Sequence, residues 1–206
     1  MTDKEYEPSS GTTSLLGYLY QLDVSVWAAL VLMLELNATA CLEIEPASEE
    51  DLESDVEDEP PVATEVADVA SYRLVIQCKT RSTGPWKRTD VSNLVDAGVR
   101  REKVKDRLLD TNIRYVLVTN AAVEGVLIDI ETDSLLRWPA AGTLPQTLKD
   151  KLPADADGRF AILSSLDAER LDYRTEALLA RTCHIPSGLV HDCREEFRRT
   201  VLVPLC

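Results

Sequence analysis

The sequence predicts an α/β fold, because apolar β-branched runs alternate along the chain with segments of helical periodicity. The runs SYRLVIQCK (71–79) and IRYVLVTN (113–120) have the composition of buried strands. Apolar residues recur at helical spacing between 12 and 36, and two more helices are expected at 167–182 and 187–201. Strands separated by helices typically form one sheet that the helices cover.

The other elements are shorter and continue the same alternation. Residues 1–10 are expected to form a leader without regular structure, and 11–140 a core domain with a flexible acidic insertion at about 53–70. Residues 141–206 are expected to form a C-terminal extension of strand and helices, leading toward further domains of a larger protein. Short strands are predicted at 40–45 and 160–166, and helices at 90–109, 121–138 (irregular) and 144–151.

Charge is distributed very unevenly along the chain. The formal net charge is −14, but the segment 43–68 holds twelve acidic residues and no Lys or Arg. Without that segment 24 acidic residues face 22 basic ones, and the segment 79–107 has nine bases and four acids, a net charge of +5. An acidic insertion therefore lies beside a mildly basic stretch, and the overall charge does not exclude a nucleic-acid partner.

The sequence predicts a cytoplasmic protein without a membrane span. Its polar, acidic N-terminal segment lacks the profile of a secretory signal. The longest uncharged apolar run, 24–34, has eleven residues, whereas a helix that crosses a bilayer needs about 20. The five cysteines are scattered and do not form the pattern of a disulfide framework, which favours a reducing compartment.

The strand at 71–79 becomes polar on one face at its C-terminal end. Strand alternation places Gln77 and Lys79 on that face. Leu74, Ile76 and Cys78 then point to the opposite face and pack the core. Ligand sites in open α/β sheets commonly lie at strand ends. The alternative interpretation is an edge strand with solvated Gln and Lys side chains.

Acidic residues upstream are candidates to complete a site there. Glu43 and Glu45 are two apart on a predicted strand and share a face, and Asp51 follows six residues after Glu45. If the strands of Glu45 and Lys79 are neighbours, carboxylates, an amide oxygen and an ammonium group converge. Mg²⁺ binds hard oxygen ligands of this kind and activates water for phosphodiester hydrolysis, and a nearby lysine can orient that water.

In their order along the chain, these residues resemble the Mrr-like PD-(D/E)xK nuclease family, in which Gln replaces the usual second acid. The matching stretches are GYLYQLD, LEIEPASEEDLE, LVIQCKTRSTGPW and RYVLVTNA, within a span of roughly 11–121 that is just over half of the chain. More narrowly, the chain resembles the double-strand DNA nuclease domain of bacterial antiphage effectors of the CBASS and STAND types.

The resemblance implies a restriction-endonuclease-like fold, a three-layer core with a central mixed sheet flanked by helices, followed here by C-terminal helices. It also implies cleavage of duplex DNA with Mg²⁺ or Mn²⁺, controlled by homo-oligomeric assembly or by sensor domains of a larger defence protein. Asp51 would be the metal-binding acid, Gln77 the residue at the second acidic position and Lys79 the catalytic lysine. Glu45 fits the preceding acid that completes the metal shell, and Gln21 the supporting polar residue of the first helix.

The identity of the motif acid has two competitors. Asp51 and Gln77 are 26 positions apart, a longer separation than a short hairpin gives, and Asp55 and Asp58 lie within it. Asp51 is preferred because the apolar Leu52 follows it, as in the family pattern.

A basic stretch, TRSTGPWKR, follows the strand that carries Gln77 and Lys79. Arg81, Lys87 and Arg88 are candidates for contacts with DNA phosphates, and Trp86 for packing on a sugar or base. A tryptophan packed against its own domain is the alternative for Trp86. Two other functions remain open for the chain: a catalytically inactive nuclease-like module for oligomerisation or recognition, and an α/β interaction domain without a nucleic-acid partner.

Overall fold

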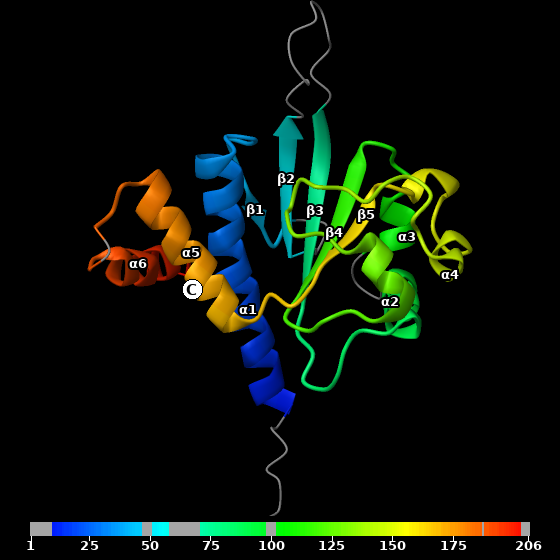
Figure 1. Ribbon diagram of the computed structural model, residues 1–206, viewed down its shortest axis with the longest axis horizontal. Helices are drawn as coiled ribbons and strands as arrows, with labels where there is room; N and C mark the ends of the chain where they lie inside the picture. The colour runs from blue at the N-terminus through cyan, green and yellow to red at the C-terminus, as the bar shows by residue number, and fades with distance from the viewer. Residues whose placement is uncertain (1–9, 47–50, 58–70, 98–101, 187, 203–206) are drawn as a thin grey trace, which may run out of the picture.

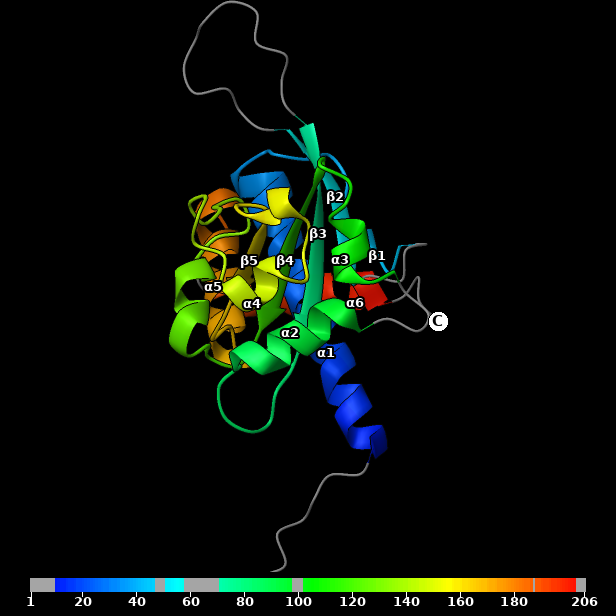
Figure 2. The same ribbon diagram turned by 90° about the vertical axis from the view of Figure 1, so that its right-hand side faces the viewer.

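The computed structural model describes residues 10–46, 51–57, 71–97, 102–186 and 188–202. Its described part has three layers, with α1, α5 and α6 on one face of a sheet and α2, α3 and α4 on the other (Figures 1 and 2). The predicted α/β class, a mixed sheet flanked by helices and followed by C-terminal helices, is confirmed. This architecture agrees with a restriction-endonuclease-like core.

The bounds of the elements agree with the sequence pattern for the long elements and differ for several short ones. The strands are β1 (Glu43–Ile44), β2 (Leu52–Glu57), β3 (Ser71–Lys79), β4 (Ile113–Thr119) and β5 (Phe160–Leu163). The helices are α1 (Ser10–Ala29), continued by the π-helix η1 (Leu30–Glu35), α2 (Arg88–Asp96), α3 (Val104–Arg107), the 3-10 helix η2 (Gly125–Ile130), α4 (Gln146–Lys149), the 3-10 helix η3 (Ala154–Ala156), α5 (Ala168–Thr182) and α6 (Val190–Leu202).

The five strands lie in the order β1-β2-β3-β4-β5. β1, β2 and β3 pair antiparallel, whereas β3, β4 and β5 run parallel. The start of β2 and the ends of β3, β4 and β5 therefore meet at one edge of the sheet. β3 is the central strand, so the interpretation of Gln77 on an exposed edge strand is wrong.

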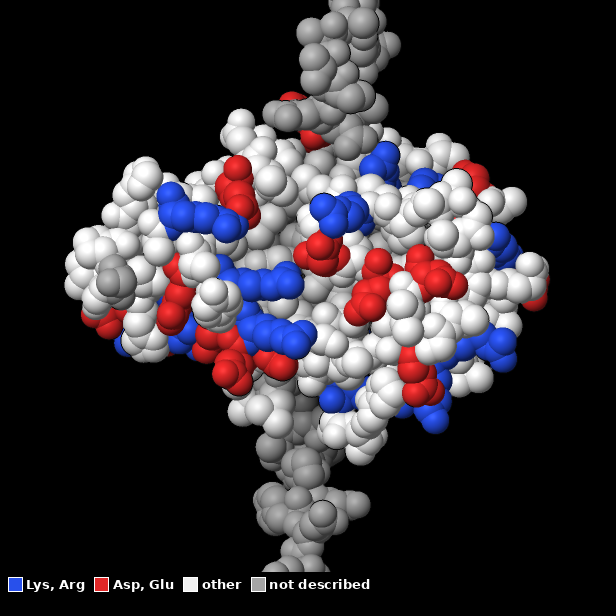
Figure 3. Space-filling view, viewed as in Figure 1, with Lys and Arg blue, Asp and Glu red and all other residues white. Residues whose placement is uncertain are grey.

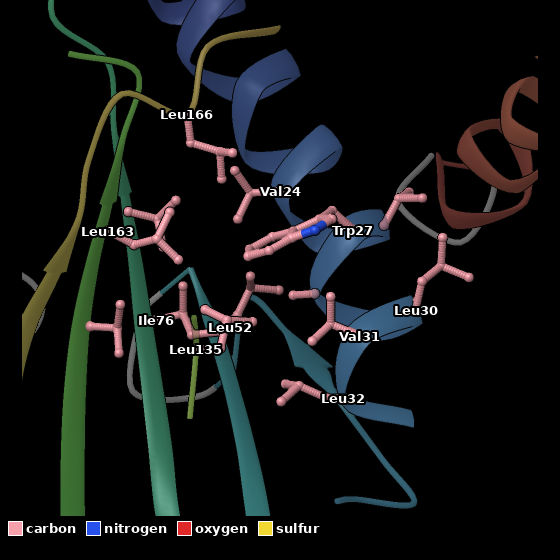
Figure 4. Close-up of a cluster of buried hydrophobic side chains, with 14 of the residues drawn as sticks. Val24, Trp27, Leu30, Val31, Leu32, Leu52, Ile76, Leu135, Leu163 and Leu166 are labelled. Carbon is pink, nitrogen blue, oxygen red and sulfur yellow. The ribbon is translucent and has the colours of Figure 1, made fainter. Parts of the chain in front are cut away.

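The predicted alternation of β3 is confirmed, and it divides the core in two. Ile76 and Cys78 pack beneath α1 and α5, together with apolar residues of β4 and β5. Val75 belongs to a second cluster on the opposite face, beneath α2 and η2. In Figure 4, Val24 and Trp27 reach from α1 toward Ile76 and other strand residues. Burial on both faces is what makes β3 almost continuously apolar.

Four expectations about the elements need correction, and the first is the irregular helix at 121–138, of which only the 3-10 helix η2 is found. Residues 53–57 belong to β2 rather than to a flexible insertion, because Leu52 and Val56 are fully buried in the core. The strand expected at 40–45 contains only Glu43–Ile44, since Glu45 turns into the left-handed region with φ 49°. The single helix expected at 90–109 is two helices, and Ala97 after α2 is extended. The remainder of the insertion, 58–70, and leader residues 1–9 lie outside the described residues.

One apolar helical stretch, Ser14–Glu35, is long enough to cross a membrane by length and composition alone. Of its most apolar 18-residue window, 56 % is buried inside the molecule. α1 lies against the sheet and against α5 and α6 (Figure 1). This is the environment of the core helix of a soluble protein, which passes the same length and composition test.

Candidate active site

Asp51 is fixed immediately before β2, where that strand begins to pair with β3. The first residue pair is Leu52 with Ile76. Strand pairing does not extend to Asp51 and Gln77. Instead, the Asp51 Oδ2 atom accepts a hydrogen bond of 2.5 Å from the backbone N–H of Cys78. The Asp51 carbonyl accepts from the backbone N–H of Glu45 at 3.0 Å. The carboxylate is thereby held near the C-terminal end of β3, at the backbone of Cys78.

Gln77, the residue before Cys78 on β3, has an unpaired side-chain oxygen. Its side chain is only 1 % exposed. The Oε1 atom is buried and, within the described residues, has no hydrogen-bond partner. Buried carbonyl oxygens are normally satisfied, and one left unsatisfied costs about 1–3 kcal/mol. This unpaired oxygen lies one residue along β3 from the amide that binds Asp51, and it is an acceptor that a ligand or a buried water can use.

Lys79 ends β3 beside this pair and is half-buried. Within the described part of the chain its ammonium group forms no ion pair. Burial raises the pKa of the Cys78 thiol well above its usual range; the Asp51 charge raises it further, and the Lys79 charge opposes the shift. Both charges therefore act on the residue between Gln77 and Lys79.

Asp51 and Gln77 carry oxygen atoms of the kind that Mg²⁺ binds. Asp51 offers a carboxylate and Gln77 an amide carbonyl, and Mg²⁺ commonly takes one or two carboxylates while keeping several waters. Among the described residues there is no group of three or more His, Cys, Asp or Glu side chains that could hold a metal ion. The fit therefore depends on the Asp51 carboxylate, the unpaired Gln77 oxygen, and water or phosphate oxygens.

Glu45 is brought to Asp51 by its backbone, and its side chain is exposed. The condition that the strands of Glu45 and Lys79 are neighbours is not met, because β2 lies between β1 and β3. Nor do Glu43 and Glu45 share a strand face, because the extended conformation ends at Ile44. The Glu43 carboxylate instead accepts from Arg73 at 2.8 Å.

The two competitors of Asp51 are placed differently. Asp55 is exposed, pairs in register with Arg73 and accepts from its guanidinium at 3.2 Å. It therefore lies four residues up the strand from Asp51, away from Gln77. Asp58 lies outside the described residues. Of the two described acids, Asp51 is the one that bonds to Cys78, the residue after Gln77.

Gln21 comes from α1, which crosses the sheet near the end of β3. A Cβ atom placed on Gly17 would lie 3.9 Å from the Thr80 hydroxyl, and Gln21 is one helical turn further on the same side of α1. The neighbouring Tyr20 is close enough to Cys78 for the thiol to contribute to the raised pKa of the phenol, although burial is the larger cause. Gln21 thus approaches the site from the face opposite Gln77.

The basic loop after β3 is anchored to the ends of β3 and β4. The backbone N–H of Arg81 donates to Asn120 at 2.8 Å, and the Arg81 guanidinium pairs with Asp90 at 2.8 Å. Lys87 and Arg88 are exposed at the start of α2. These two side chains remain accessible for the predicted phosphate contacts, whereas Arg81 is already engaged.

Trp86 is part of the core rather than of the surface. Its side chain is only 8 % exposed and its indole N–H donates to the Thr119 hydroxyl at 2.8 Å. The Arg81 guanidinium lies over the ring, 5.2 Å from its centroid. The burial favours the packed-tryptophan alternative over stacking on DNA.

Sequence reasoning missed a buried ion-pair network next to Asp51. Glu53, only 3 % exposed, accepts from Arg73 at 2.7 Å and from Arg107 at 2.6 Å. It links the start of β2 to β3 and α3. An arginine inside the apolar run SYRLVIQCK was the available signal, because a charge on a buried strand requires a partner.

Comparisons with known proteins show a shared fold and no sequence relative. A scan against protein-family models and a search of curated proteins found no match. The chain is similar to the Cap4 SAVED/CARF-domain containing receptor of Acinetobacter baumannii, solved with the cyclic trinucleotide 3'3'3'-cAAA, with a TM-score of 0.54 and 13 % identity. That similarity covers 90 % of this chain and 40 % of the receptor.

Two further solved structures are similar at the same low identity. The Moraxella osloensis Cap4 SAVED/CARF-domain containing receptor has a TM-score of 0.52 and 14 % identity, over 89 % of this chain and 42 % of its own. The MspJI restriction endonuclease, in complex with a 27-mer oligonucleotide, has a TM-score of only 0.41 and 13 % identity, over 96 % of this chain and 39 % of its own. The chain thus spans about two fifths of each of these proteins.

Proposed function

We propose that the chain is a metal-dependent endonuclease domain that hydrolyses phosphodiester bonds of double-stranded DNA, with a PD-(D/E)xK-type site of the Mrr-like form. The observation that carries the proposal is the unpaired, buried oxygen of Gln77, the residue before the Cys78 amide that binds the Asp51 carboxylate; Lys79 follows Cys78 on the same strand. Most buried side-chain oxygens have a hydrogen-bond partner, so an unpaired one is available to a ligand. The order acid, glutamine, lysine also agrees with the resemblance in sequence.

The setting of this activity is proposed to be bacterial antiphage defence. Both Cap4 receptors share the fold over most of this chain, and the resemblance in sequence is to nuclease domains of antiphage effectors. A domain of this size, which matches two fifths of a receptor chain, would act in the cytoplasm together with sensor domains or further copies of itself.

The residues divide the work at the end of β3. Asp51 and Gln77 would hold Mg²⁺ or Mn²⁺, whereas Glu45 reaches Asp51 only through its backbone and Gln21 lies on the face opposite Gln77. When bound, such an ion lowers the pKa of a coordinated water and offsets charge on the phosphate. Lys79, one residue past Cys78, would donate hydrogen bonds to the attacking water or to a phosphate oxygen. Lys87 and Arg88 contact the DNA backbone.

Plasmid cleavage with Mg²⁺ or Mn²⁺ tests the proposal. The wild type should cut, and Lys79→Ala should lose about 10²–10⁴-fold, the usual contribution of a positioned acid–base group. Lys149→Ala is the matched control, because Lys149 lies on α4 and pairs with Asp157. Equal cutting by wild type and Lys79→Ala would remove Lys79 from the mechanism.

A catalytically inactive nuclease-like module is the second candidate. It is favoured by the absence, within the described residues, of a group of three acidic, His or Cys ligands. Mn²⁺ binding measured by electron paramagnetic resonance separates the two functions. An active site should bind Mn²⁺ and lose it in Asp51→Asn, whereas an inactive module should neither bind the ion at Asp51 nor cut DNA. A long distance between Asp51 and Lys79 would favour the interaction-domain alternative; Asp51 bonds to the backbone of Cys78, the residue before Lys79.

A further inference from the structure

The two sides of α5 carry opposite charges. Arg170, Arg174 and Arg181 lie within roughly 40° of one another around the helix, at about 100° per residue. Asp172 and Glu176 lie on approximately the opposite side, about 200–240° from Arg170. Charge on a surface helix is commonly mixed, so complete separation of the two signs points to two different partners.

The acidic side of α5 already has its partner within the chain. Arg194 of α6, whose side chain is only 9 % exposed, pairs with Asp172 at 2.9 Å and with Glu176 at 3.1 Å. The two helices pack together through these contacts (Figure 1). The acidic residues therefore stabilise the attachment of α6.

The arginine side opens on the surface instead. Two hollows of about 340 and 470 Å³ adjoin there, and Arg174 lines both. Arg181 lines one hollow, Arg170 the other, and Arg137 borders the second from the segment after η2. Figure 3 shows Lys and Arg side chains gathered over α5 on this face, with acidic side chains among them. We call the two hollows and their four arginines the α5 groove.

Carboxylates in the α5 groove neutralise part of this charge. Glu35, Glu131 and Asp133 are its acidic lining residues. Glu35 accepts from Arg181. The pair of Arg137 with Asp133, at 3.0 Å, has side chains that are 72 % and 68 % exposed, and exposed pairs contribute only about 0–1 kcal/mol. Such a pair exchanges readily for a phosphate contact.

Two arginines of the α5 groove, Arg170 and Arg174, have guanidinium groups without a carboxylate partner within the described residues. Arg170 donates to the Ser165 carbonyl at 2.8 Å, which leaves further guanidinium N–H groups. Arg174 lies over the Trp27 ring at 5.8 Å and forms no ion pair within the described part of the chain. A guanidinium fixed by stacking and lacking a carboxylate partner is well suited to bind phosphate.

The α5 groove also begins at the edge of the sheet where the candidate active site lies. The backbone N–H of Leu166, just before α5, donates to the Thr119 carbonyl at the end of β4. The neighbouring Asn120 holds Arg81 in the loop after β3. A duplex bound at the end of β3 would therefore meet α5 on the same edge.

We infer that the arginine stripe of the α5 groove is a second contact surface for the phosphate backbone of duplex DNA. This inference rests on the proposed DNA substrate. From Arg170 to Arg181 the stripe is about 16 Å long, and phosphates recur every ~3.4 Å along one strand, so several lie within its reach. No base-reading group is needed, because the contacts are to phosphates.

Binding measured without cleavage tests the inference. Fluorescence anisotropy of a labelled 30-base-pair duplex is followed in EDTA at several salt concentrations, with the whole chain. The double variant Arg170→Gln/Arg174→Gln should reduce the slope of log affinity against log salt by about 2. The loss of affinity between 50 and 200 mM salt then becomes roughly 12-fold smaller than in the wild type.

Matched variants separate charge from folding. Arg199→Gln removes an arginine that is 74 % exposed on α6 and should leave the slope unchanged. The pair Arg170→Lys/Arg174→Lys keeps the charge and should keep most of the slope. Thermal unfolding of each variant, followed by circular dichroism, shows whether the Trp27 contact was needed for folding.

The inference is overturned if the Arg170→Gln/Arg174→Gln variant folds and its salt slope is the same as that of the wild type. It is also overturned if a low concentration of polyglutamate displaces the duplex from the wild type but not from that variant. This second result would indicate an acidic peptide as the partner. Absence of duplex binding by the wild type overturns it too. If the wild type binds the duplex but does not cleave DNA with Mg²⁺, the proposed nuclease activity is refuted and the proposed contact surface is not. Cleavage with no effect of the arginine variants refutes the surface alone.

Discussion

Replacing Gln77 by Leu separates the stability of this protein from its proposed activity. Gln77 is 1 % exposed on the central strand, between Ile76 and Cys78, and its Oε1 atom has no partner within the described residues. Leu has a similar size and no polar atom. The substitution removes a buried, unsatisfied carbonyl from the free protein and, under the proposed function, a metal ligand from the active one.

The expected gain in stability follows from that oxygen. A buried acceptor without a partner costs about 1–3 kcal/mol, and removal of the group returns this amount. The free energy of unfolding of Gln77→Leu should therefore exceed that of the wild type by about 1–3 kcal/mol without metal. For a chain of this length each kcal/mol corresponds to roughly 2–4 °C in the unfolding midpoint. Metal-dependent DNA cleavage should be lost in the same variant.

Urea unfolding in EDTA and plasmid cleavage with Mg²⁺ are the two assays. Gln146→Leu is the control, because Gln146 is exposed on α4 and bonds Asp150 at 2.8 Å; it should change stability by no more than about 0.5 kcal/mol. Destabilisation of Gln77→Leu by more than about 1 kcal/mol would show that the amide is hydrogen-bonded in the folded protein. The reasoning from an unpaired oxygen would then fail.

Three further predictions concern the surroundings of the site. Glu53→Gln leaves two arginines without their shared buried carboxylate and should lower the free energy of unfolding in urea by about 3 kcal/mol. Asp55→Asn, at an exposed acid on the same strand, should lower it by less than about 1 kcal/mol. Similar losses of stability in both variants would contradict the importance of burial. Trp86→Phe should cost about 1–2 kcal/mol through the lost indole hydrogen bond and leave the salt slope of DNA binding unchanged; a shallower slope would return Trp86 to the DNA interface. Hydrogen bonds from Lys151 and Lys105 lower the pKa of Asp96 to about 2, below the unfolded value near ~3.9. The contribution of Asp96 to stability is therefore present above pH ~4 and is lost as the pH falls toward 2. Acid unfolding of Asp96→Asn should lose that part of its pH dependence, and a profile identical to that of the wild type would refute the ion pairs.

The α/β class and the course of β3 could be predicted from the sequence alone. Alternation with a period of two places Ile76 and Cys78 on one face and Gln77 on the other whatever the strand pairs with. The long helical pattern of α1 and the β-branched run of β4 are likewise local. The position of Asp51 as the preferred acid came from its apolar successor, Leu52, which the structure buries at the start of β2.

Only the tertiary structure decided which distant groups meet. The register of β2 on β3 takes Asp55 to Arg73 and leaves Asp51 at Cys78, and local composition does not encode a register between strands this far apart. The same holds for Glu53, an acid in an acidic run that becomes a core residue because two arginines reach it. Trp86 lies in a basic stretch, and Thr119, distant in sequence, places it in the core by accepting its indole N–H. Periodicity is a property of neighbouring residues, whereas pairing is settled by the free energy of the whole packed chain.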